Sequence, residues 1–197
     1  MNDLNLEAGI RPPTEDASGF REGYLLYGRN VSDDLFMYLT RRLAADEGVL
    51  PGAEYLLTFD VEFHSRDSAG SFGGGGAPAA DVFVKVGGSS YPIETSLDAN
   101  SGLFGNYRIN IDKSNQGASG SDASIAGNVA NGLPATRPDG RANDRFNLAR
   151  RTHTHPNPVR ADADGNLYIV VGTESGFQAT TTLYYRSISV TLTPVTS

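Results

Sequence analysis

Residues 180–193 read TTTLYYRSISVTLT, and this stretch decides the fold. From Ile188 onward the apolar residues Ile188, Val190 and Leu192 alternate with serine and threonine. Successive side chains of a strand point to opposite faces, so the alternation predicts a strand with one buried and one solvated face. Such strands are typical of antiparallel sheets, in which one face packs on the core and the other meets water. We therefore expect an all-β protein, an antiparallel jelly-roll β-sandwich with long loops.

Arg186 conflicts with this alternation, because a strand with period two would place it on the same inward face as Ile188. Two explanations are open. A β-bulge near Arg186 would insert one residue and shift the register, or the side chain would point into a partly open cleft. We favour the bulge.

Other segments repeat the strand signal. Residues 54–64 (EYLLTFDVEFH) place the apolar side chains at 55, 57, 59, 61 and 63 on one face and mostly polar side chains on the other. Residues 35–43 (LFMYLTRRL) fit a strand or a helix, and we predict a strand because a break with Pro51 and Gly52 follows. Further strands are expected at 23–28, 106–112, 124–129 and 166–172, with Tyr107, Ile109 and Ile111 inward, and a hairpin around Gly88 joining 81–87 to 90–94.

The chain has 197 residues, which suits one large β-domain. Residues 1–21 are polar and contain Pro12 and Pro13, so we expect a flexible N-terminal arm there and a single β-sandwich domain over 22–197. The first residues, MNDLNLEAGIRPP, lack the apolar core of a signal peptide. The chain is therefore either cytoplasmic or a form from which a leader is absent.

Composition excludes several classes of function. The formal net charge is −7 and no basic stripe is visible, which argues against nucleic acid as a partner. With no cysteine, the chain cannot form a disulfide or a thiolate metal site. No apolar run approaches the roughly 20 residues of a membrane-spanning helix.

Three segments resemble a family of uncharacterised bacterial exported proteins and lipoproteins. They are SDDLFMYL (32–39), NIDKSNQ (110–116) and GTESGFQATTTLYY (172–185). The family carries SDDLFMF, NIDKGNQ and GTDSGFEGTTTLYY in the same order, so this chain departs from it at Ser114, Glu174, Gln178 and Ala179. The resemblance implies an extracytoplasmic location (periplasmic, cell-surface or secreted) and a β-sandwich similar to carbohydrate-binding modules.

Acidic residues in turns and at strand ends are candidates for a calcium site, because Ca²⁺ takes six to eight oxygen ligands. The alternative for each turn is ordinary bonding of aspartate to nearby backbone N–H groups. If the turns met in space they would form one site. The candidates are Asp33, Asp34, Asp112, Asp162, Asp164 and Glu174.

Three further groups of residues could form a metal-binding, catalytic or sugar-binding site. His153 and His155 are two apart in an extended segment and could face one Zn²⁺ or Cu²⁺, with His64 or an aspartate as third ligand. Asp60 and Glu62 share one strand face about 6–7 Å apart, a spacing compatible with a glycosidase. Sugar rings could stack on exposed tyrosines, for which the candidates are Tyr24, Tyr27, Tyr38, Tyr91 and Tyr107.

Taken together, these patterns favour a non-catalytic exported bacterial module that binds glycan or another cell-surface ligand and is stabilised by calcium. Two alternatives stay open: a carbohydrate-active hydrolase that uses surface carboxylates, and a structural or assembly domain without a small ligand. The sequence leaves the ligand and the oligomeric state undetermined.

Overall fold

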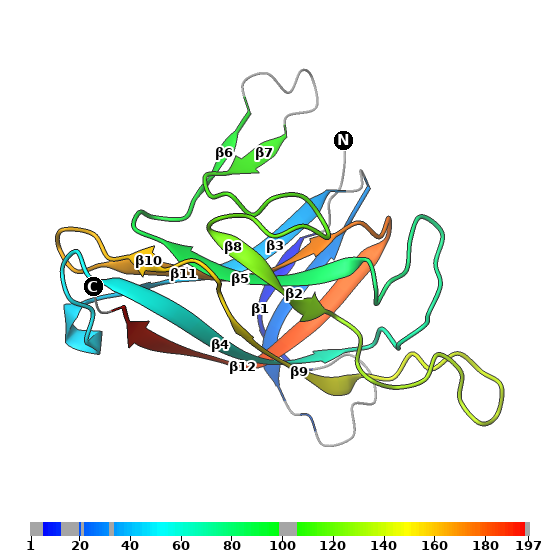
Figure 1. The fold of residues 1–197 in the computed structure, drawn as a ribbon. Helices are drawn as coiled ribbons and strands as arrows, with labels where there is room; N and C mark the ends of the chain where they lie inside the picture. The colour runs from blue at the N-terminus through cyan, green and yellow to red at the C-terminus, as the bar shows by residue number, and fades with distance from the viewer. Residues whose placement is uncertain (1–5, 13–19, 21, 32–33, 99–105, 196–197) are drawn as a thin grey trace.

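The protein consists of two antiparallel β-sheets packed face to face, as seen in a computed structural model that describes residues 6–12, 20, 22–31, 34–98 and 106–195 (Figure 1). The strands of the first sheet are β1 (Glu7–Arg11), β2 (Gly23–Arg29), β4 (Glu54–Ser65), β9 (Asn147–Thr154), β10 (Val159–Arg160) and β12 (Thr180–Pro194). Those of the second sheet are β3 (Leu35–Leu43), β5 (Val82–Ser89), β8 (Ala123–Asn128) and β11 (Leu167–Ser175). A 3-10 turn, η1 (Ala45–Glu47), follows β3, and β6 (Thr95–Leu97) pairs with β7 (Tyr107–Ile109). The all-β, antiparallel sandwich predicted from residues 180–193 is confirmed.

The strand order is that of a jelly roll. Apart from β1 and β10, the sheets read β2-β12-β4-β9 and β3-β11-β5-β8. The chain passes from one sheet to the other between most successive strands, and β2 and β12, the first and last of these eight, lie side by side. Two four-stranded sheets linked in this way form the double Greek key of jelly-roll proteins.

The predicted bulge occurs at Arg186. Tyr185 pairs with Phe63 and Ser187 with Glu62, so Arg186 is the extra residue on β12. Its side chain is 57% exposed and lies 3.8 Å from the Glu62 carboxylate. The shift returns Ile188, Val190 and Leu192 to the inward face, where they pack against the main core.

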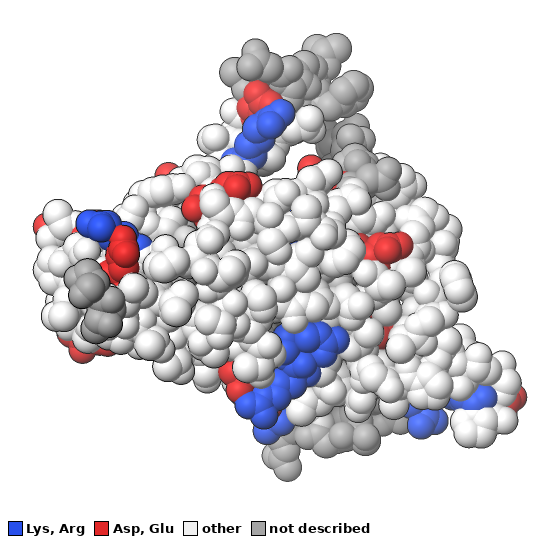
Figure 2. Space-filling model, viewed as in Figure 1, with Lys and Arg blue, Asp and Glu red and all other residues white. Residues whose placement is uncertain are grey.

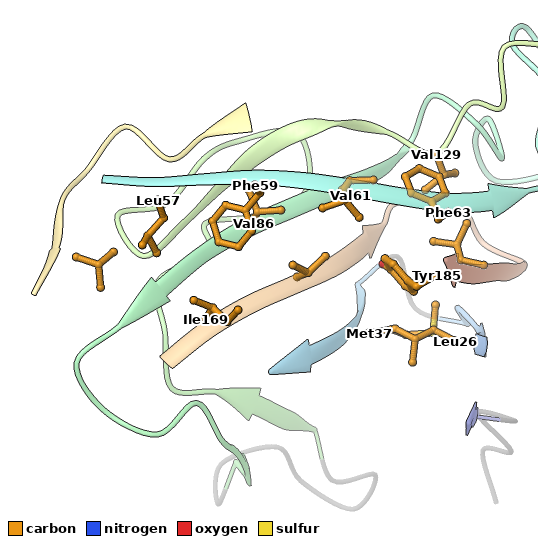
Figure 3. Close-up of a cluster of buried hydrophobic side chains, with 14 of the residues drawn as sticks. Leu26, Met37, Leu57, Phe59, Val61, Phe63, Val86, Val129, Ile169 and Tyr185 are labelled. Atoms are coloured by element: carbon orange, nitrogen blue, oxygen red, sulfur yellow. The ribbon is translucent and has the colours of Figure 1, made fainter. Parts of the chain in front are cut away.

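The main core fills the space between the sheets (Figure 3). On β4 the inward side chains are at most 2% exposed, and they are Tyr55, Leu57, Phe59, Val61 and Phe63. They meet valines of β5 and the inward residues of β11. Burying each such side chain stabilises the fold by about 1.5–3 kcal/mol relative to leaving it in water.

A second, smaller core lies on the outer face of the second sheet. Ile93 and Ile111 pack there against Val170 of β11 and Ala123 of β8. The segment between β5 and β8 therefore covers this face, while its β6–β7 hairpin projects from the body of the molecule (Figure 1). The outer face of the second sheet is thus buried, unlike that of a simple two-layer sandwich.

Several sequence predictions about local structure were wrong. Residues 7–11, expected in the flexible arm, form edge strand β1 paired with β2, because backbone pairing at an edge needs no apolar pattern. Gly88 is not a hairpin turn but lies within β5, opposite Ile169, and residues 90–94 form no strand with β5. Tyr107 is 71% exposed, because the β6–β7 hairpin has no third strand to bury it. Within the described residues, no helix is long and apolar enough to cross a membrane.

Candidate functional site

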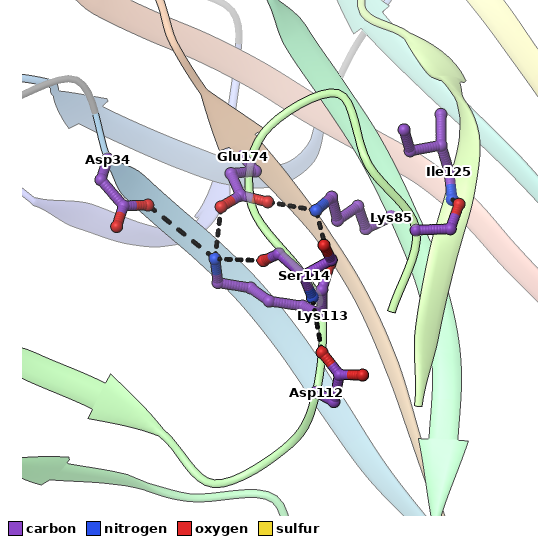
Figure 4. Close-up of polar contacts among 8 residues, drawn as sticks. Asp34, Lys85, Asp112, Lys113, Ser114, Ile125 and Glu174 are labelled. Carbon is purple, nitrogen blue, oxygen red and sulfur yellow. Dashed lines mark hydrogen bonds and ion pairs between the residues drawn. The ribbon is translucent and has the colours of Figure 1, made fainter. Parts of the chain in front are cut away.

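The three segments that resemble one family meet at a single place in the structure (Figure 4). Asp34 comes from the first segment, Lys113 from the second and Glu174 from the third. Lys113 Nζ forms an ion pair with Glu174 Oε1 and lies 3.8 Å from Asp34 Oδ1. We call these three residues and Lys85 the lysine–glutamate cluster.

Strand geometry places Glu174 on the outward face of β11, above the second sheet. Lys85 lies on the neighbouring strand β5, opposite Gly172, and its ammonium forms an ion pair with Glu174 Oε2. It also donates a hydrogen bond of 2.6 Å to the backbone carbonyl of Lys113. Lys85 and Lys113 are the only lysines in the chain, so both are used in this one cluster.

The cluster contains two positive and two negative side chains and is buried at its centre, while the Asp34 side chain at its edge is 60% exposed. The Lys85 and Glu174 side chains are 0% exposed. Burial lowers the pKa of Lys85, and the interaction of its ammonium with the Glu174 carboxylate opposes that shift. Burial also raises the pKa of Asp34, helped by the neighbouring Glu174 carboxylate and opposed by Lys113. The ammonium groups of Lys85 and Lys113 therefore lie beside the Glu174 carboxylate, where a metal cation would otherwise bind. They also hold residues 113–114 on the sheet.

The segment beside the cluster has unusual backbone geometry. Ser114 has φ 55° and Gln116 has φ 39°, and both are in the left-handed region that favours glycine. The N–H of Ser114 is held at 2.9 Å by Asp112 Oδ1, and its carbonyl accepts a hydrogen bond from Lys113 Nζ. Strained positions of this kind gather at functional or tightly constrained sites.

The five calcium candidates that the structure describes do not form one site. Asp34 and Glu174 meet at Lys113, whereas Asp112 accepts backbone N–H groups of Ser114 and Ser121, the latter being the main reason that its pKa is lowered. Asp33 lies outside the described residues. In the described ranges, no group of three or more histidine, aspartate or glutamate side chains is arranged to hold a metal ion.

Asp162 and Asp164 lie in a separate turn before β11. Asp162 Oδ1 accepts the N–H groups of Asp164 at 2.9 Å and of Asn166 at 2.7 Å, and the Asn166 bond is the main cause of its lowered pKa. Glu174 is near the other end of β11, about 20 Å away at the rise of a strand. This turn therefore has the ordinary aspartate–backbone bonding considered as the alternative.

His153 and His155 face the same way, as expected, but they meet at a serine. Ser124 Oγ lies 2.9 Å from His153 Nε2 and 2.8 Å from His155 Nδ1. His155 Nε2 lies 3.0 Å from the Ser121 carbonyl, which can only accept, so this nitrogen carries the proton and Nδ1 accepts from Ser124. Burial lowers the pKa of both histidines. Two neutral imidazoles and one hydroxyl thus join β9 to β8.

His64, the suggested third ligand, is elsewhere on β4. It stacks on Phe20 with ring centroids 3.9 Å apart. On the β4–β9 ladder His153 is opposite Phe59 and His64 is opposite Leu148, so five residues separate them, about 16 Å. His64 therefore does not complete a metal site with His153 and His155.

The carboxylates considered for hydrolysis are held in ion pairs. Both oxygens of Asp60 accept from the Arg150 guanidinium, and this hydrogen bonding lowers the pKa of Asp60. Glu62 accepts from Ser187 Oγ at 3.1 Å and faces Arg186. In Figure 2 the largest group of basic side chains on that face lies near β9, with acidic side chains beside it. A general acid needs a raised pKa, and Asp60 has the reverse.

The five candidate tyrosines do not share one surface. Tyr24 and Tyr27 are on β2, and Tyr38 on β3 stacks with Phe36. Tyr91 is 42% exposed and borders a pocket of about 140 Å³. The pocket is otherwise lined by Gly88, Ser89, Ser90, Ser121, Asp122, Pro158, Val159 and Arg160. It lies beside the histidine–serine contact, since Ser121 takes part in both.

Sequence reasoning missed the lysines of the cluster, Ser124, and the pocket residues Asp122 and Arg160. One signal for Lys85 was available, because a single lysine interrupts the apolar run DVFVKVG at an outward position. No local pattern marks Ser124 or Arg160, since their partners are distant in the chain.

No protein-family model and no curated protein matches the chain. Among solved structures it is similar to the enzymatically active domain of bacteriophage CBA120 tailspike protein 4, with 7% identity and a TM-score of 0.37. It is also similar to a structure from work on promiscuous specificity in carbohydrate-binding modules of the β-sandwich superfamily, with 12% identity and a TM-score of 0.36. Each alignment covers 95% of this chain, but 18% of the tailspike chain and 54% of the module chain. At these scores the functional argument rests on the residues of this chain.

Proposed function

We propose that the protein is a non-catalytic carbohydrate-binding module and that glycan binds in the polar pocket beside Tyr91. Three separate segments build this pocket: the end of β5 with residues 89–91, the 121–122 turn, and residues 158–160. The strands of the jelly roll hold all three segments in position, so the pocket is preformed.

The chemistry of the lining supports a sugar ligand. Tyr91 offers a partly exposed ring for stacking, and its hydroxyl lies 3.4 Å from Asp122 Oδ2. Burial and Asp122 raise the pKa of Tyr91, so its hydroxyl stays protonated as a donor. The Asp122 carboxylate can accept from sugar hydroxyls, and serine hydroxyls can both accept and donate. The Arg160 guanidinium donates to Glu54 through Nε and Nη2 and keeps its other N–H groups for a sugar. An aromatic ring beside convergent polar groups is the observation that carries the proposal.

The volume points to a small subsite. About 140 Å³ is below the roughly 300–1,000 Å³ of pockets for drug-sized ligands. We infer that one sugar unit of a longer chain enters the pocket and that neighbouring units lie on the surface.

A glycan array followed by calorimetry tests the proposal with two matched variants. Tyr91→Ala removes the ring at the pocket and should weaken binding at least tenfold. Tyr107→Ala removes a more exposed tyrosine that does not line the pocket, and should bind like the wild type. Binding unchanged in Tyr91→Ala, or no glycan bound by the wild type, would refute the proposal.

The non-catalytic part of the proposal is supported by the ion pairs of Asp60 and Glu62 described above. Incubation with a panel of polysaccharides should release no reducing ends. Release that disappears in Asp60→Ala would instead establish the hydrolase alternative.

The proposal includes an exported location, which is supported by the resemblance of the three segments. Fractionation of the native cells with an antibody against this protein should find it outside the cytoplasm. Recovery in the cytoplasmic fraction alone would contradict this part.

A further inference from the structure

On one flank of the sandwich, a strand edge has no partner strand among the residues that the structure describes. The pairing of β12 with β2 ends at Tyr185 and Tyr24. Beyond the bulge, β4 is the only strand that pairs with β12 among the described residues. In Figure 1 this dark red half of β12 runs along the margin of the sheet.

The backbone groups on the open edge can be identified from one hydrogen bond. Val195 donates to the Glu54 carbonyl at 2.8 Å, so the pair 195–54 is hydrogen-bonded. Hydrogen-bonded pairs alternate along an antiparallel ladder, so residues 187, 189, 191 and 193 bond to β4. The N–H and C=O groups of Ile188, Val190 and Leu192 then point to the open edge. Pro194 has the same parity, which fits a residue without an N–H donor.

A groove of about 400 Å³ lies against this edge, between the two sheets; its lining is mostly apolar and also includes Thr40 and the Arg41–Glu47 ion pair. Its walls include Ile188, Val190 and Leu192 of β12 and Leu39 and Leu43 of β3. The three β12 side chains are only half-buried, although they continue the main core. The groove therefore exposes core side chains beside unpaired backbone groups.

The open edge lacks the features that normally prevent strand addition. Residues 187–194, SISVTLTP, contain no charged side chain, and the bulge and the proline stand only at the two ends. Natural edge strands are usually protected by charges, bulges or prolines within the strand. The facing edge strand β3, in contrast, carries Arg41 and Arg42.

We propose that this edge pairs with the same edge of a second copy to form a two-fold symmetric dimer. Antiparallel pairing centred on Val190 places Val190 opposite its own copy and Ile188 opposite Leu192. The backbone groups of Ile188, Val190 and Leu192, which point to the open edge, then form hydrogen bonds with those of the second copy. The apolar side chains of the second copy cover the groove. Because residues 187–194 are uncharged, the two paired strands bring no like charges together, and Arg41 of the groove is already paired with Glu47.

Sedimentation equilibrium tests the dimer with a pair of opposite charges. The wild type should be a dimer at micromolar concentration, and Val190→Lys and Val190→Glu should each raise the dissociation constant at least about 100-fold. Mixing the two variants should restore a dimer, because the opposite charges then face each other. Thr152→Lys makes the same charge change on the outward side of β9 and should remain dimeric. A monomeric wild type, a dimeric Val190→Lys or a monomeric mixture would overturn the proposal.

Amide hydrogen exchange on the wild type needs no variant and keeps the proposal testable if the variants misfold. The amides of Ile188, Val190 and Leu192 should become more protected as protein concentration rises. Those of Ser189 and Thr191 should be protected at every concentration, since they donate to β4. Concentration-independent exchange at 188, 190 and 192 would contradict the dimer.

Discussion

Single residues in this protein are constrained most clearly where the backbone is strained. Ser114 has a φ of 55°, which costs a non-glycine residue about 1–2 kcal/mol. Its contacts with Asp112 and Lys113 use only its backbone. A side chain is therefore unnecessary at this position.

Ser114→Gly should stabilise the protein by about 1 kcal/mol and raise Tm by about 2–4 °C. Calorimetry measures the shift. Ser96→Gly, in exposed strand β6, is the matched control and should lower Tm slightly, because glycine weakens a strand. A lower Tm for Ser114→Gly would mean that the serine side chain makes a contact of its own.

Asp67 provides a pH-dependent test at the same scale. Burial raises the pKa of Asp67 to about 6. A carboxyl whose pKa is raised on folding holds its proton more tightly in the folded state, so the folded state loses stability as pH rises through 6. Asp67→Asn should therefore increase the free energy of unfolding by about 1–3 kcal/mol at pH 7.5.

The gain from Asp67→Asn should shrink as pH falls from 6 to 4 and vanish below 4, where the wild-type carboxyl is protonated in both states. Urea unfolding at several pH values measures this difference between the two proteins. Asp164→Asn, at an exposed turn position, should give little change at any pH. A constant difference across the range would exclude Asp67 as the titrating group.

Elements that lie far apart in the sequence are joined by the lysine–glutamate cluster. Its charges come from β5, β11 and the segment before β8, and Lys85 and Glu174 have no exposed surface. Removing one partner of a buried ion pair costs about 3–5 kcal/mol, because the other charge is left uncompensated. The cluster thus fixes the outer layer on the second sheet.

Lys85→Met should destabilise the protein by about 3–5 kcal/mol, and Glu174→Met by at least as much. The double variant should be more stable than the sum of the two losses predicts, since no buried charge of this pair is left alone and Lys113 still lies near Asp34. Urea unfolding of the four proteins gives the coupling free energy. Simple additivity would show that Lys85 and Glu174 do not interact energetically.

The elements also show what a sequence can predict. The strand at 35–43 and the bulge at Arg186 were predicted correctly, because period-two alternation and its interruption are local signals. The hairpin at Gly88 was wrong, because Gly87 and Gly88 imitate a turn, whereas pairing with β11 and β8 keeps β5 extended there. The sequence left open whether its acidic turns meet in space. It could not reveal the role of Lys85, which depends on long-range strand pairing that no local pattern contains.

At the whole-molecule scale, lysine ammonium groups and backbone N–H groups contact the carboxylates that were expected to bind calcium. Asp34 and Glu174 face lysines, and Asp112 and Asp162 accept backbone N–H groups. Because lysine ammonium groups or backbone N–H groups already contact these carboxylates, a bound Ca²⁺ would have to displace those partners. Calcium stabilisation stays a prediction of the sequence, and the geometry favours the opposite outcome.

Thermal unfolding with excess EDTA and with millimolar CaCl₂ should therefore give the same Tm. A ligand that binds the folded state at 100 times its Kd would stabilise it by about 2.7 kcal/mol, a shift that is easily measured. A rise of several degrees with calcium would restore the metal site.

The bulge at Arg186 makes the final strand tolerant of a change at this position but not of an extra residue beyond it. Exchanging the arginine for another polar residue alters one exposed side chain and should be nearly neutral. Deleting it would leave Tyr185 and Ser187 adjacent, opposite Phe63 and Glu62, so the ladder would become regular and Ile188, Val190 and Leu192 would stay inward. Inserting one residue after Ser187 would instead turn hydroxyls inward and three aliphatic side chains into water. An indel scan read out by soluble yield should thus tolerate substitution or deletion at 186 and reject a one-residue insertion after 187.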